Sequence, residues 1–316
     1  MDKNSYEFFL TKVDEYLTDH KYDPNLTKTT DALNPFVKFY KQSGIPITDY
    51  TKENFDSYFK TVCGTPQSSA VTRTVLARLF TNLGFEDISE IIRSAKNNYK
   101  MNYFADFEAL DSRIEKVRSE NFLSVEGAPT DAPCDTYTMA QIILYLAWIG
   151  VPNLILTQMP LTSINVEEQY IDGGKKYSYA DNPKIAQVFE KYKNSDYYIG
   201  MTTKKGKVYF CSNSYQGDTL IRTRAKPTGS NVNITTTLNR IKTTFNGDEA
   251  FSYYNVFRSG QFFRGFKKLT TGILPEFSDP DNLWDYFRVQ LDTADSRSFF
   301  KKEWEAYLKW RQETIK

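Results

Sequence analysis

The 316-residue sequence contains one histidine and three cysteines, and the scarcity of these residues excludes several kinds of chemistry. His20 lies near the N-terminus and is expected on the surface, so the C-terminal two thirds of the chain has no imidazole for proton transfer or metal ligation. Cys63, Cys134 and Cys211 are far apart and show no metal-binding spacing. We therefore expect free, buried thiols in a reducing cytoplasm, and neither a metal ion nor a cofactor.

Long apolar runs are also absent. No segment approaches the roughly 18 uncharged apolar residues of a membrane-spanning helix. The longest run, residues 139–156, includes Gln141, Pro152 and Asn153 and is typical of a buried helix. The first residues carry mixed charge and no apolar segment, so no signal peptide is visible. These absences predict a cytoplasmic protein that does not engage a membrane.

The net charge is only +1, but the charges are unevenly distributed along the chain. Residues 202–268 contain 12 Lys and Arg against 3 Asp and Glu, whereas the segments on either side are neutral or acidic. Such a cationic segment is typical of a protein that binds a polyanion. A folded surface on which these charges are balanced is the alternative interpretation.

Apolar residues recur at helical spacing in five segments of residues 1–98, which predicts an all-helical N-terminal domain. Gly44 and Gly84 are predicted to end the second and fourth of these helices. Residues 96–104 are polar and predict a linker. The predicted N-cap residues are Thr27 or Thr30, Thr51, and Ser68 or Ser69.

Residues 99–316 predict a larger domain in which helices surround a small β-structure. Gly173 and Gly174 separate two strand-like segments, Ile164–Ile171 and Lys175–Tyr179, and predict a tight hairpin. The fold class is therefore mainly α with a small β-hairpin or sheet, in two domains. The remaining predictions are helices over 105–120, 137–149, 183–193, 234–245, 251–269 and 296–312, strands over 197–201 and 207–212, and a basic loop over 218–232.

The order of these elements resembles the tyrosine recombinase (phage integrase) family. In the N-terminal domain, TTDALNPFVKFYKQSGIPITDYTKENFDSYF at 29–59 and SSAVTRTVLARLFTNLG at 68–84 resemble the family's core-binding domain. In the C-terminal domain, YTMAQIILYLAWIGVPNLILTQMPLTSINVEEQYI at 137–171 is similar to the segment around the family's first catalytic arginine. The resemblance implies a helical core-binding-like domain over 1–98 and a catalytic-like domain over 99–316.

The catalytic positions are where the sequence departs from this family. Pro152 stands in place of the first arginine, Ile155 in place of an acidic residue, and Asn255 in place of the histidine of a His-x-x-Arg box whose arginine is Arg258. Arginines clamp the phosphate in the transition state and imidazole transfers protons, so these losses imply an inactive enzyme with no catalytic residues. By alignment, the vestigial candidates are Lys175 or Lys176 for the hairpin lysine, Trp284 for the late His or Trp, and Tyr307 for the nucleophile.

The resemblance thus implies a sequence-specific, double-stranded DNA-binding protein with no recombinase activity. Its implied role is a phage or prophage transcriptional repressor that maintains lysogeny in the cytoplasm of a bacterial cell. Lysines and arginines are expected at phosphates, and helix side chains at base edges. The predicted DNA-binding residues are Arg73, Arg78, Lys175, Lys176, Lys204, Lys205, Lys207, Arg222, Arg224, Lys226, Arg240, Arg258, Arg264, Lys267 and Lys268.

Two other functions stay open at this point. An active, divergent recombinase would use Arg258, a hairpin lysine and Tyr307, although Tyr307 equally fits a packing role between Trp304 and Trp310. An accessory protein would bind another recombinase or a regulator instead of DNA. The resemblance also allows an antirepressor or regulatory protein as a partner, and a second copy of the chain bound through the C-terminal helix.

Overall fold

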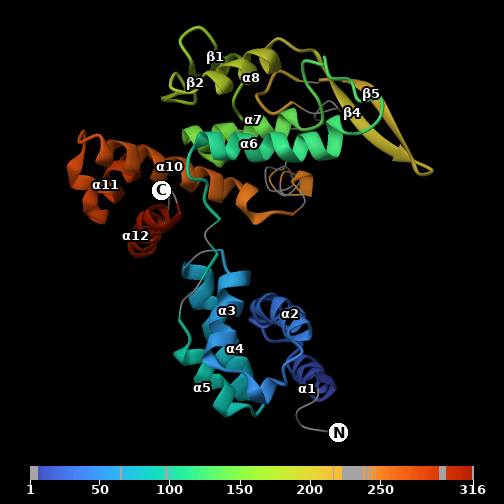
Figure 1. The fold of residues 1–316 in the computed structure, drawn as a ribbon, viewed down its shortest axis with the longest axis vertical. Coiled ribbons are helices and arrows are strands. Elements are labelled where there is room, and N and C mark those ends of the chain that lie inside the picture. Colours follow the sequence, from blue (N-terminus) through green and yellow to red (C-terminus); the bar gives the residue numbers. More distant parts are fainter. Residues whose placement is uncertain are drawn as a thin grey trace. The chain divides into compact units, whose positions relative to one another are not determined.

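Helices make up most of the computed structural model, and two small antiparallel sheets complete it (Figure 1). The prediction of a mainly α chain with a small β-structure is therefore confirmed. The structure describes residues 6–64, 66–96, 99–100, 102–215, 217–222, 238, 241, 243–245, 247–291 and 297–314. The chain divides into a first unit, Met1–Met101 with Ser298–Glu303, and a second unit, Asn102–Arg297 with Trp304–Lys316.

The first unit packs its helices around an aromatic core. Phe36 is fully buried at the centre, and its ring centroid lies 6.1 Å from that of Phe9, 5.8 Å from that of Phe55 and 5.4 Å from that of Phe80. Stacked and edge-on rings add to the free energy gained by burying apolar surface. The helices are α1 (Tyr6–Asp19), α2 (Leu26–Ser43), α3 (Lys52–Val62), α4 (Pro66–Asn82) and α5 (Glu86–Ser94), with a short 3-10 turn at Ile47–Asp49.

Helix α3 begins as predicted. Thr51 is its N-cap, and the Thr51 backbone N–H donates to Asn54 Oδ1 at 2.8 Å as one half of a capping box. Gly44 also ends α2 as predicted, with a left-handed φ of 64°. Local sequence signals therefore determine these two helix ends.

The other predicted N-caps are wrong. Helix α2 begins at Leu26, so Thr27 and Thr30 lie within it. Helix α4 begins at Pro66, so Ser68 and Ser69 also lie within a helix. Proline at the first helical position lacks only an N–H that the helix would leave unused, and its fixed φ suits a helix start.

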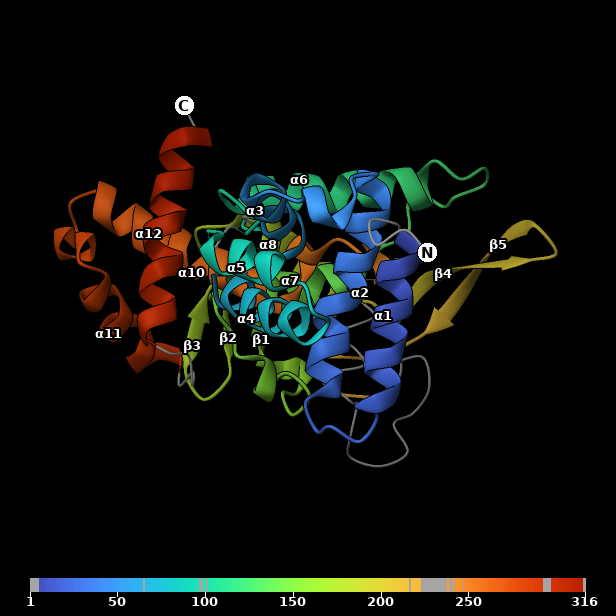
Figure 2. The same ribbon diagram turned by 90° about the horizontal axis from the view of Figure 1, so that it is seen from below.

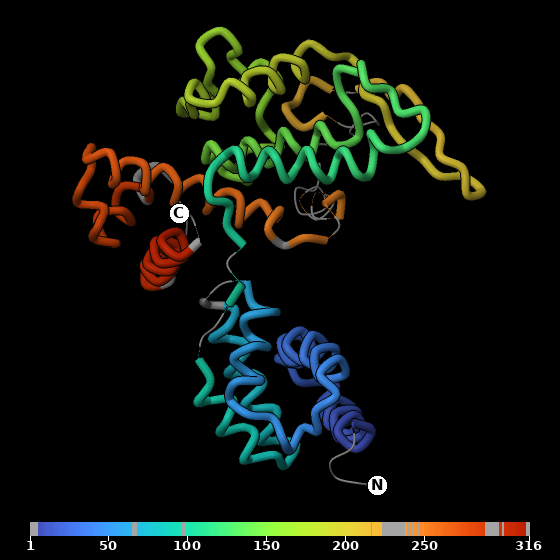
Figure 3. The backbone as a smooth tube through the Cα atoms, viewed as in Figure 1, coloured from blue at the N-terminus to red at the C-terminus, as the bar shows by residue number. Residues whose placement is uncertain are grey.

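The second unit is built around α7 (Thr138–Ile149), which is buried along almost its whole length. Helix α10 (Tyr253–Thr270) packs along α7. The two ribbon views and the tube show α6 (Phe107–Arg118) beside α7 (Figures 1, 2 and 3). A Cβ on Gly260 of α10 would lie 2.0 Å from the Trp148 carbonyl oxygen. Only glycine at this position lets the two helices approach so closely.

Besides α10, three further α-helices whose bounds the structure describes follow α7 in the chain. The structure agrees with the predicted helix at α8 (Pro183–Lys193) and adds α11 (Pro280–Leu291), which the sequence analysis did not predict. Helix α12 (Arg297–Thr314) contributes residues to both units. Most of the predicted helix 234–245 lies outside the described residues.

The first sheet corrects one predicted strand. Residues 164–171 are not a single strand but β1 (Ile164–Asn165) and β2 (Tyr170–Asp172), because a turn that contains Gln169 at φ 55° separates them. The predicted Gly-Gly hairpin is confirmed between β2 and β3 (Lys176–Ser178). Ile164, Ile171 and Tyr177 are paired across the three strands and are all buried, so this face packs on the unit.

The predicted linker 96–104 is only partly correct. Tyr103 and Phe104 are buried in the second unit, and the Phe104 N–H donates to Ser259 Oγ at 3.0 Å. Their aromatic side chains find partners in the core, where the Tyr103 ring centroid lies 5.6 Å from that of Phe262. The sequence predicted a linker here because the residues on the N-terminal side of Tyr103 and Phe104 are mostly polar.

Candidate nucleic-acid interface

Strands β4 (Tyr197–Lys204) and β5 (Lys207–Ser214) form a hairpin that carries three of the predicted DNA-binding lysines. Lys205 and Gly206 form the turn with φ values of 51° and 75°, as a type I′ turn requires. Lys204 and Lys207 are the last cross-strand pair before this turn. All three lysines are exposed, and within the described part of the chain none has an ion-pair partner.

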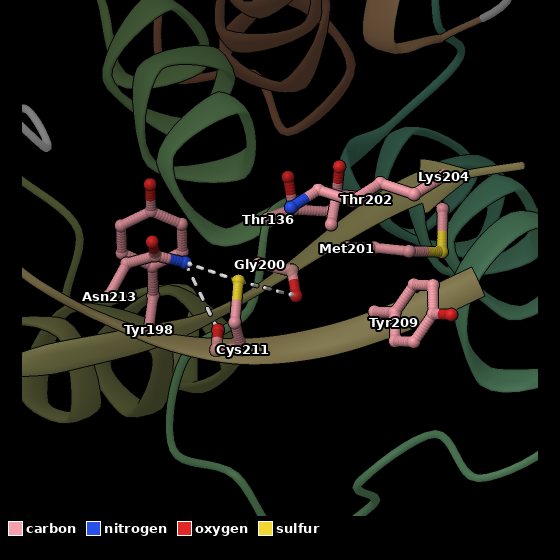
Figure 4. A pocket seen from close by; sticks show the side chains of 9 residues that line it. All are labelled: Thr136, Tyr198, Gly200, Met201, Thr202, Lys204, Tyr209, Cys211 and Asn213. Carbon is pink, nitrogen blue, oxygen red and sulfur yellow. Dashed lines mark hydrogen bonds between the residues drawn. The ribbon is translucent and has the colours of Figure 1, made fainter. Parts of the chain in front are cut away.

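Hydroxyl, amide and lysine side chains line one face of this hairpin (Figure 4). Side chains alternate between the two faces of a strand, so Thr202 and Lys204 of β4 lie on the same side as Tyr209 of β5. An open hollow of about 610 Å³ lies over this face. Its lining residues are Thr136, Tyr198, Gly200, Met201, Thr202, Lys204, Tyr209, Cys211 and Asn213.

Two residues of this face have structural roles. Asn213 Nδ2 donates to the Cys211 carbonyl at 3.0 Å, and a Cβ on Gly200 would lie 2.3 Å from the same nitrogen. Cys211 itself is exposed, whereas Cys63 and Cys134 are buried. The expectation of a buried thiol is therefore wrong for Cys211, because β5 places it on the hairpin face that lines the hollow, where the described residues leave it exposed.

The inner end of the hairpin is held by the segment before α7. The Ile199 N–H donates to the Cys134 carbonyl at 2.9 Å. The neighbouring Asp135 is buried, and its carboxylate accepts from Arg118 Nε at 2.5 Å and from the Tyr137 N–H at 2.8 Å. Burial lowers the pKa of the Arg118 guanidinium, but the neighbouring carboxylates more than offset this and raise it overall. The hairpin is therefore anchored at one end and exposed at the other.

The first unit exposes one of its two predicted DNA-binding arginines. Arg78 is exposed on α4, on the same side as Thr74 and the half-exposed Val71. Arg73, in contrast, is half-buried, and its Nη1 donates to the Ala95 carbonyl at 2.9 Å. The predicted outward orientation of Arg73 is therefore wrong, because its guanidinium satisfies a carbonyl at the end of α5.

The sequence analysis missed two further cations beside helix α4. Lys28 of α2 lines a small hollow of about 80 Å³ together with Arg78. Arg93 of α5 is exposed, and its Nη2 donates to Thr81 Oγ1 at 3.2 Å. Helical spacing alone groups residues within one helix, so it could not bring these three helices together.

Four predicted DNA-binding cations lie on α10: Arg258, Arg264, Lys267 and Lys268. Lys267 is exposed and pairs with Asp181 at 3.8 Å, and Lys268 lies over the Tyr286 ring at 5.5 Å. Arg264 turns inward, and its guanidinium donates to the Trp148 carbonyl and lies against Gly150 at the end of α7. Burial lowers the pKa of Arg264 to about 10. The positive charge of Arg264 is attracted to the partial negative charge at the C-terminus of α7. Arg264 therefore has a structural role.

Arg222 also has a structural role instead of the predicted contact. It is 7% exposed, and its guanidinium carbon lies 4.2 Å and 4.1 Å from the ring centroids of Tyr192 and Tyr215. It donates to the carbonyls of Tyr192 and Ser195. A guanidinium enclosed in this way cannot reach a phosphate. Arg224, Lys226 and Arg240 lie outside the described residues.

Tyr307, which the resemblance to tyrosine recombinases aligns with their nucleophile, is fully buried. Its ring stacks on that of Trp304 at 5.8 Å and is tilted against that of Trp310 at the same distance. Its hydroxyl accepts from Arg311 Nη1 at 3.1 Å, and burial raises the pKa of Tyr307 to about 12. A nucleophile needs access to its target and a lowered pKa or an adjacent base, so this environment is that of a packing residue.

Arg258 and Asn255 are buried on α10. Arg258 donates through Nη1 to Gln261 Oε1 and through Nη2 to the Tyr254 hydroxyl, both at 2.9 Å. Arg258 and Tyr307 both contact the Phe262 ring, with centroid distances of 5.6 Å and 5.2 Å. The structure thus brings two positions that the resemblance aligns with catalytic residues to one aromatic side chain, but it encloses both of them.

The remaining positions that the resemblance singles out lie apart from one another, on a 3-10 turn, on the β2–β3 hairpin and in α11. Pro152 precedes a 3-10 turn, Asn153–Ile155, and the Ile155 side chain packs on Gly173 of the β2–β3 turn. Lys175 and Lys176 are exposed on that hairpin, and Lys176 pairs with Glu168 at 3.3 Å. Trp284, the remaining candidate, is buried on α11.

The described residues include no group of three or more His, Cys, Asp or Glu placed to hold a metal ion. None of the described helices combines the length and the apolar character that crossing a membrane requires. His20, the one imidazole, is exposed, and its ring stacks on that of Tyr16 at 4.1 Å.

Comparison with other proteins adds no relative. No model of a known protein family matches the chain, and no characterised protein sequence is significantly similar to it. The functional interpretation therefore depends on the residues of this chain.

Proposed function

We propose that the chain is a sequence-specific, double-stranded DNA-binding protein that does not cleave DNA. The observation that carries this proposal is the exposed tip of the β4–β5 hairpin, where Lys204, Lys205 and Lys207 gather with no acidic residue on either strand. Unpaired lysines on a projecting element attract phosphates, and phosphate contacts supply most of the affinity for DNA. The exposed Arg78 on α4 is a second cationic element.

The absence of cleavage is supported by the surroundings of the vestigial residues. The Tyr307 hydroxyl is buried with its pKa raised by burial, and the Arg258 guanidinium is engaged by Gln261 and Tyr254. Pro152 has no side-chain donor for a phosphate. A protein that binds DNA without cleaving it does not need an accessible tyrosine hydroxyl or an accessible pair of arginines.

The biological role in this proposal comes from the resemblance to tyrosine recombinases. A recombinase-like, two-domain protein that binds an operator without cutting it blocks access of RNA polymerase. We propose that it does so as a phage or prophage repressor that maintains lysogeny in the bacterial cytoplasm. An antirepressor or regulatory protein would then control it.

The test is selection of genomic DNA fragments by the purified full-length chain, followed by salt titration of binding to the recovered fragments. We expect a short recurring sequence near phage promoters, bound reversibly, with an affinity that falls steeply as salt rises. A covalent adduct that depends on Tyr307 would identify an active recombinase instead. Failure to enrich any DNA would favour an accessory protein that binds another protein.

A further inference from the structure

The β4–β5 hairpin has a feature that folding alone does not explain. Its outer half, Thr202–Tyr209, is exposed at every residue, including the apolar Val208 and the aromatic Tyr209. Views along two directions show the ribbon projecting beyond the helices of its unit (Figures 1 and 2). An isolated two-stranded hairpin is marginally stable in water, so an outer half without a packed face gains little from the core.

The tip is also electrostatically unfavourable in the free protein. Lys204 and Lys207 are directly opposite each other across the strands, and like charges at such positions destabilise a hairpin. Lys205 occupies a position with φ of 51°, where asparagine or glycine is favoured. The sequence keeps a positive charge at three of the four turn positions despite both effects, and a polyanion would relieve the repulsion.

The anchoring of the inner end suits a rigid projection. The Ile199 N–H bonds to the Cys134 carbonyl, and Asp135 is fixed by Arg118. Beyond the Met201–Phe210 pair, three further residues on each strand and the turn extend roughly 10 Å. The major groove of DNA is about 8.5 Å deep and about 12 Å wide, and it admits a two-stranded ribbon, whereas the minor groove is about half as wide.

From these observations we infer that the outer half of the β4–β5 hairpin enters the major groove of duplex DNA. The ribbon lies in the groove with one face toward the bases, so Thr202 and Tyr209 of that face approach base edges. The long side chains of Lys204, Lys205 and Lys207 at the turn extend to the phosphates that border the groove. A threonine or tyrosine hydroxyl donates to or accepts from base edges, which adds sequence preference to phosphate binding. This inference rests on the proposed DNA-binding function and names the element that performs it.

The charge test compares two variants that each remove two lysines. Lys204→Gln/Lys207→Gln removes the opposed pair, and Lys116→Gln/Lys309→Gln removes two exposed lysines elsewhere in the second unit. Both are titrated against a mixed-sequence duplex of about three helical turns over a range of salt. Because each phosphate contact contributes about 0.9 to the slope of log affinity against log salt, we expect the hairpin variant to lose about 1.8 and to bind at least tenfold more weakly. The control variant should keep both its slope and its affinity.

The groove test uses dimethyl sulfate, which methylates guanine N7 in the major groove and adenine N3 in the minor groove. It compares the wild-type chain with a variant that lacks Thr202–Thr203 and Val208–Tyr209, on the fragment recovered by genomic selection. Removing two residues from each strand shortens the ribbon by about 7 Å but keeps the alternation and all three lysines. We expect the wild-type chain to protect guanine N7 at specific guanines, and the shortened chain to lose that protection at saturating concentration.

The outcomes separate the two proposals. A wild-type chain that binds no duplex at low salt overturns the DNA-binding function itself. A wild-type chain that binds DNA while both double-lysine variants weaken equally, or neither does, overturns the role of the hairpin and leaves the function standing. Protection of adenine N3 with guanine N7 left reactive overturns the assignment to the major groove.

Discussion

The Arg118 guanidinium donates through Nε to the buried Asp135 carboxylate at 2.5 Å, and this ion pair stands at the inner end of the β4–β5 hairpin. Arg118→Met would leave a buried, uncompensated carboxylate. We expect a loss of about 3 kcal/mol in the free energy of unfolding, measured by chemical denaturation. The matched control is Lys116→Met, whose exposed pair with Glu120 at 3.8 Å should cost less than about 1 kcal/mol. Equal losses would show that the Arg118–Asp135 pair is not the anchor.

Lys205→Asn should separate stability from DNA binding. Asparagine adopts positive φ more readily than lysine, so we expect the melting temperature to stay the same or to rise. The lost positive charge should lower the salt dependence of DNA binding by about one phosphate contact. Lys205→Arg keeps the charge and serves as the control. A Lys205→Asn variant that binds DNA as tightly as the wild-type chain would contradict a contact by Lys205.

The two arginines of α4 should respond in opposite ways to substitution. Arg73→Gln removes the donor to the Ala95 carbonyl and should destabilise the chain by about 1–2 kcal/mol. Arg78→Gln removes an exposed cation and should leave stability unchanged within about 0.5 kcal/mol while weakening DNA binding. Thermal unfolding and fluorescence anisotropy with a duplex give the two measurements. A larger binding defect in Arg73→Gln than in Arg78→Gln, at a temperature where both are folded, would reverse these roles.

Introducing the residues that tyrosine recombinases carry at Pro152 and Asn255 should not create cleavage. Pro152→Arg, alone or with Asn255→His, would still leave the Tyr307 hydroxyl buried against Trp304 and Arg311. We expect no covalent protein–DNA adduct on a denaturing gel from the wild-type chain or from either variant, with folding verified by circular dichroism. Tyr307→Phe, which removes one hydroxyl, should bind DNA as the wild-type chain does. An adduct that appears with Pro152→Arg and disappears with Tyr307→Phe would show that the chain is one substitution from an enzyme.

Stability should fall in alkaline solution because several tyrosines are buried in their neutral form. Burial raises the pKa of Tyr99, Tyr179 and Tyr307 to about 12, whereas tyrosines in the unfolded chain ionise near pH ~10. A raised folded-state pKa means that the stabilisation is complete below about pH 10 and is lost between about pH 10 and 12. Ultraviolet absorbance of tyrosinate, followed together with circular dichroism, should show exposed tyrosines ionising first and buried ones on unfolding. Full ionisation of all tyrosines near pH ~10 with the fold intact would contradict this burial.

The sequence predicted most helices because their apolar spacing is a local property. The helix Pro183–Lys193 has the predicted bounds, and Thr51 and Gly44 mark helix ends as expected. Local signals were misleading where more than one residue near a helix start could serve as its N-terminal end. Thr30 and Ser69 look like N-caps, but Pro66 and the turn before Leu26 start their helices earlier.

The candidate site was less predictable, because a cation has the same local signature whether it faces solvent or core. Arg222 lies in the most cationic segment of the chain and yet is enclosed between two tyrosines. Arg73 and Arg78 are five residues apart on one helix, yet only Arg78 is exposed. The partners that decide these outcomes, such as Ala95 and Tyr192, are distant in sequence from the arginines that they bind.

By itself the sequence determined the mainly helical class, the scarcity of histidine and cysteine, and the concentration of positive charge in residues 202–268, since these follow from composition and periodicity. Only the tertiary structure decided which of those charges are exposed. Burying an arginine requires carbonyls and aromatic rings brought together from separate elements, and a projecting hairpin requires the absence of any such cover. For this reason three lysines at one turn, and not the whole cationic segment, are the centre of the proposed interface.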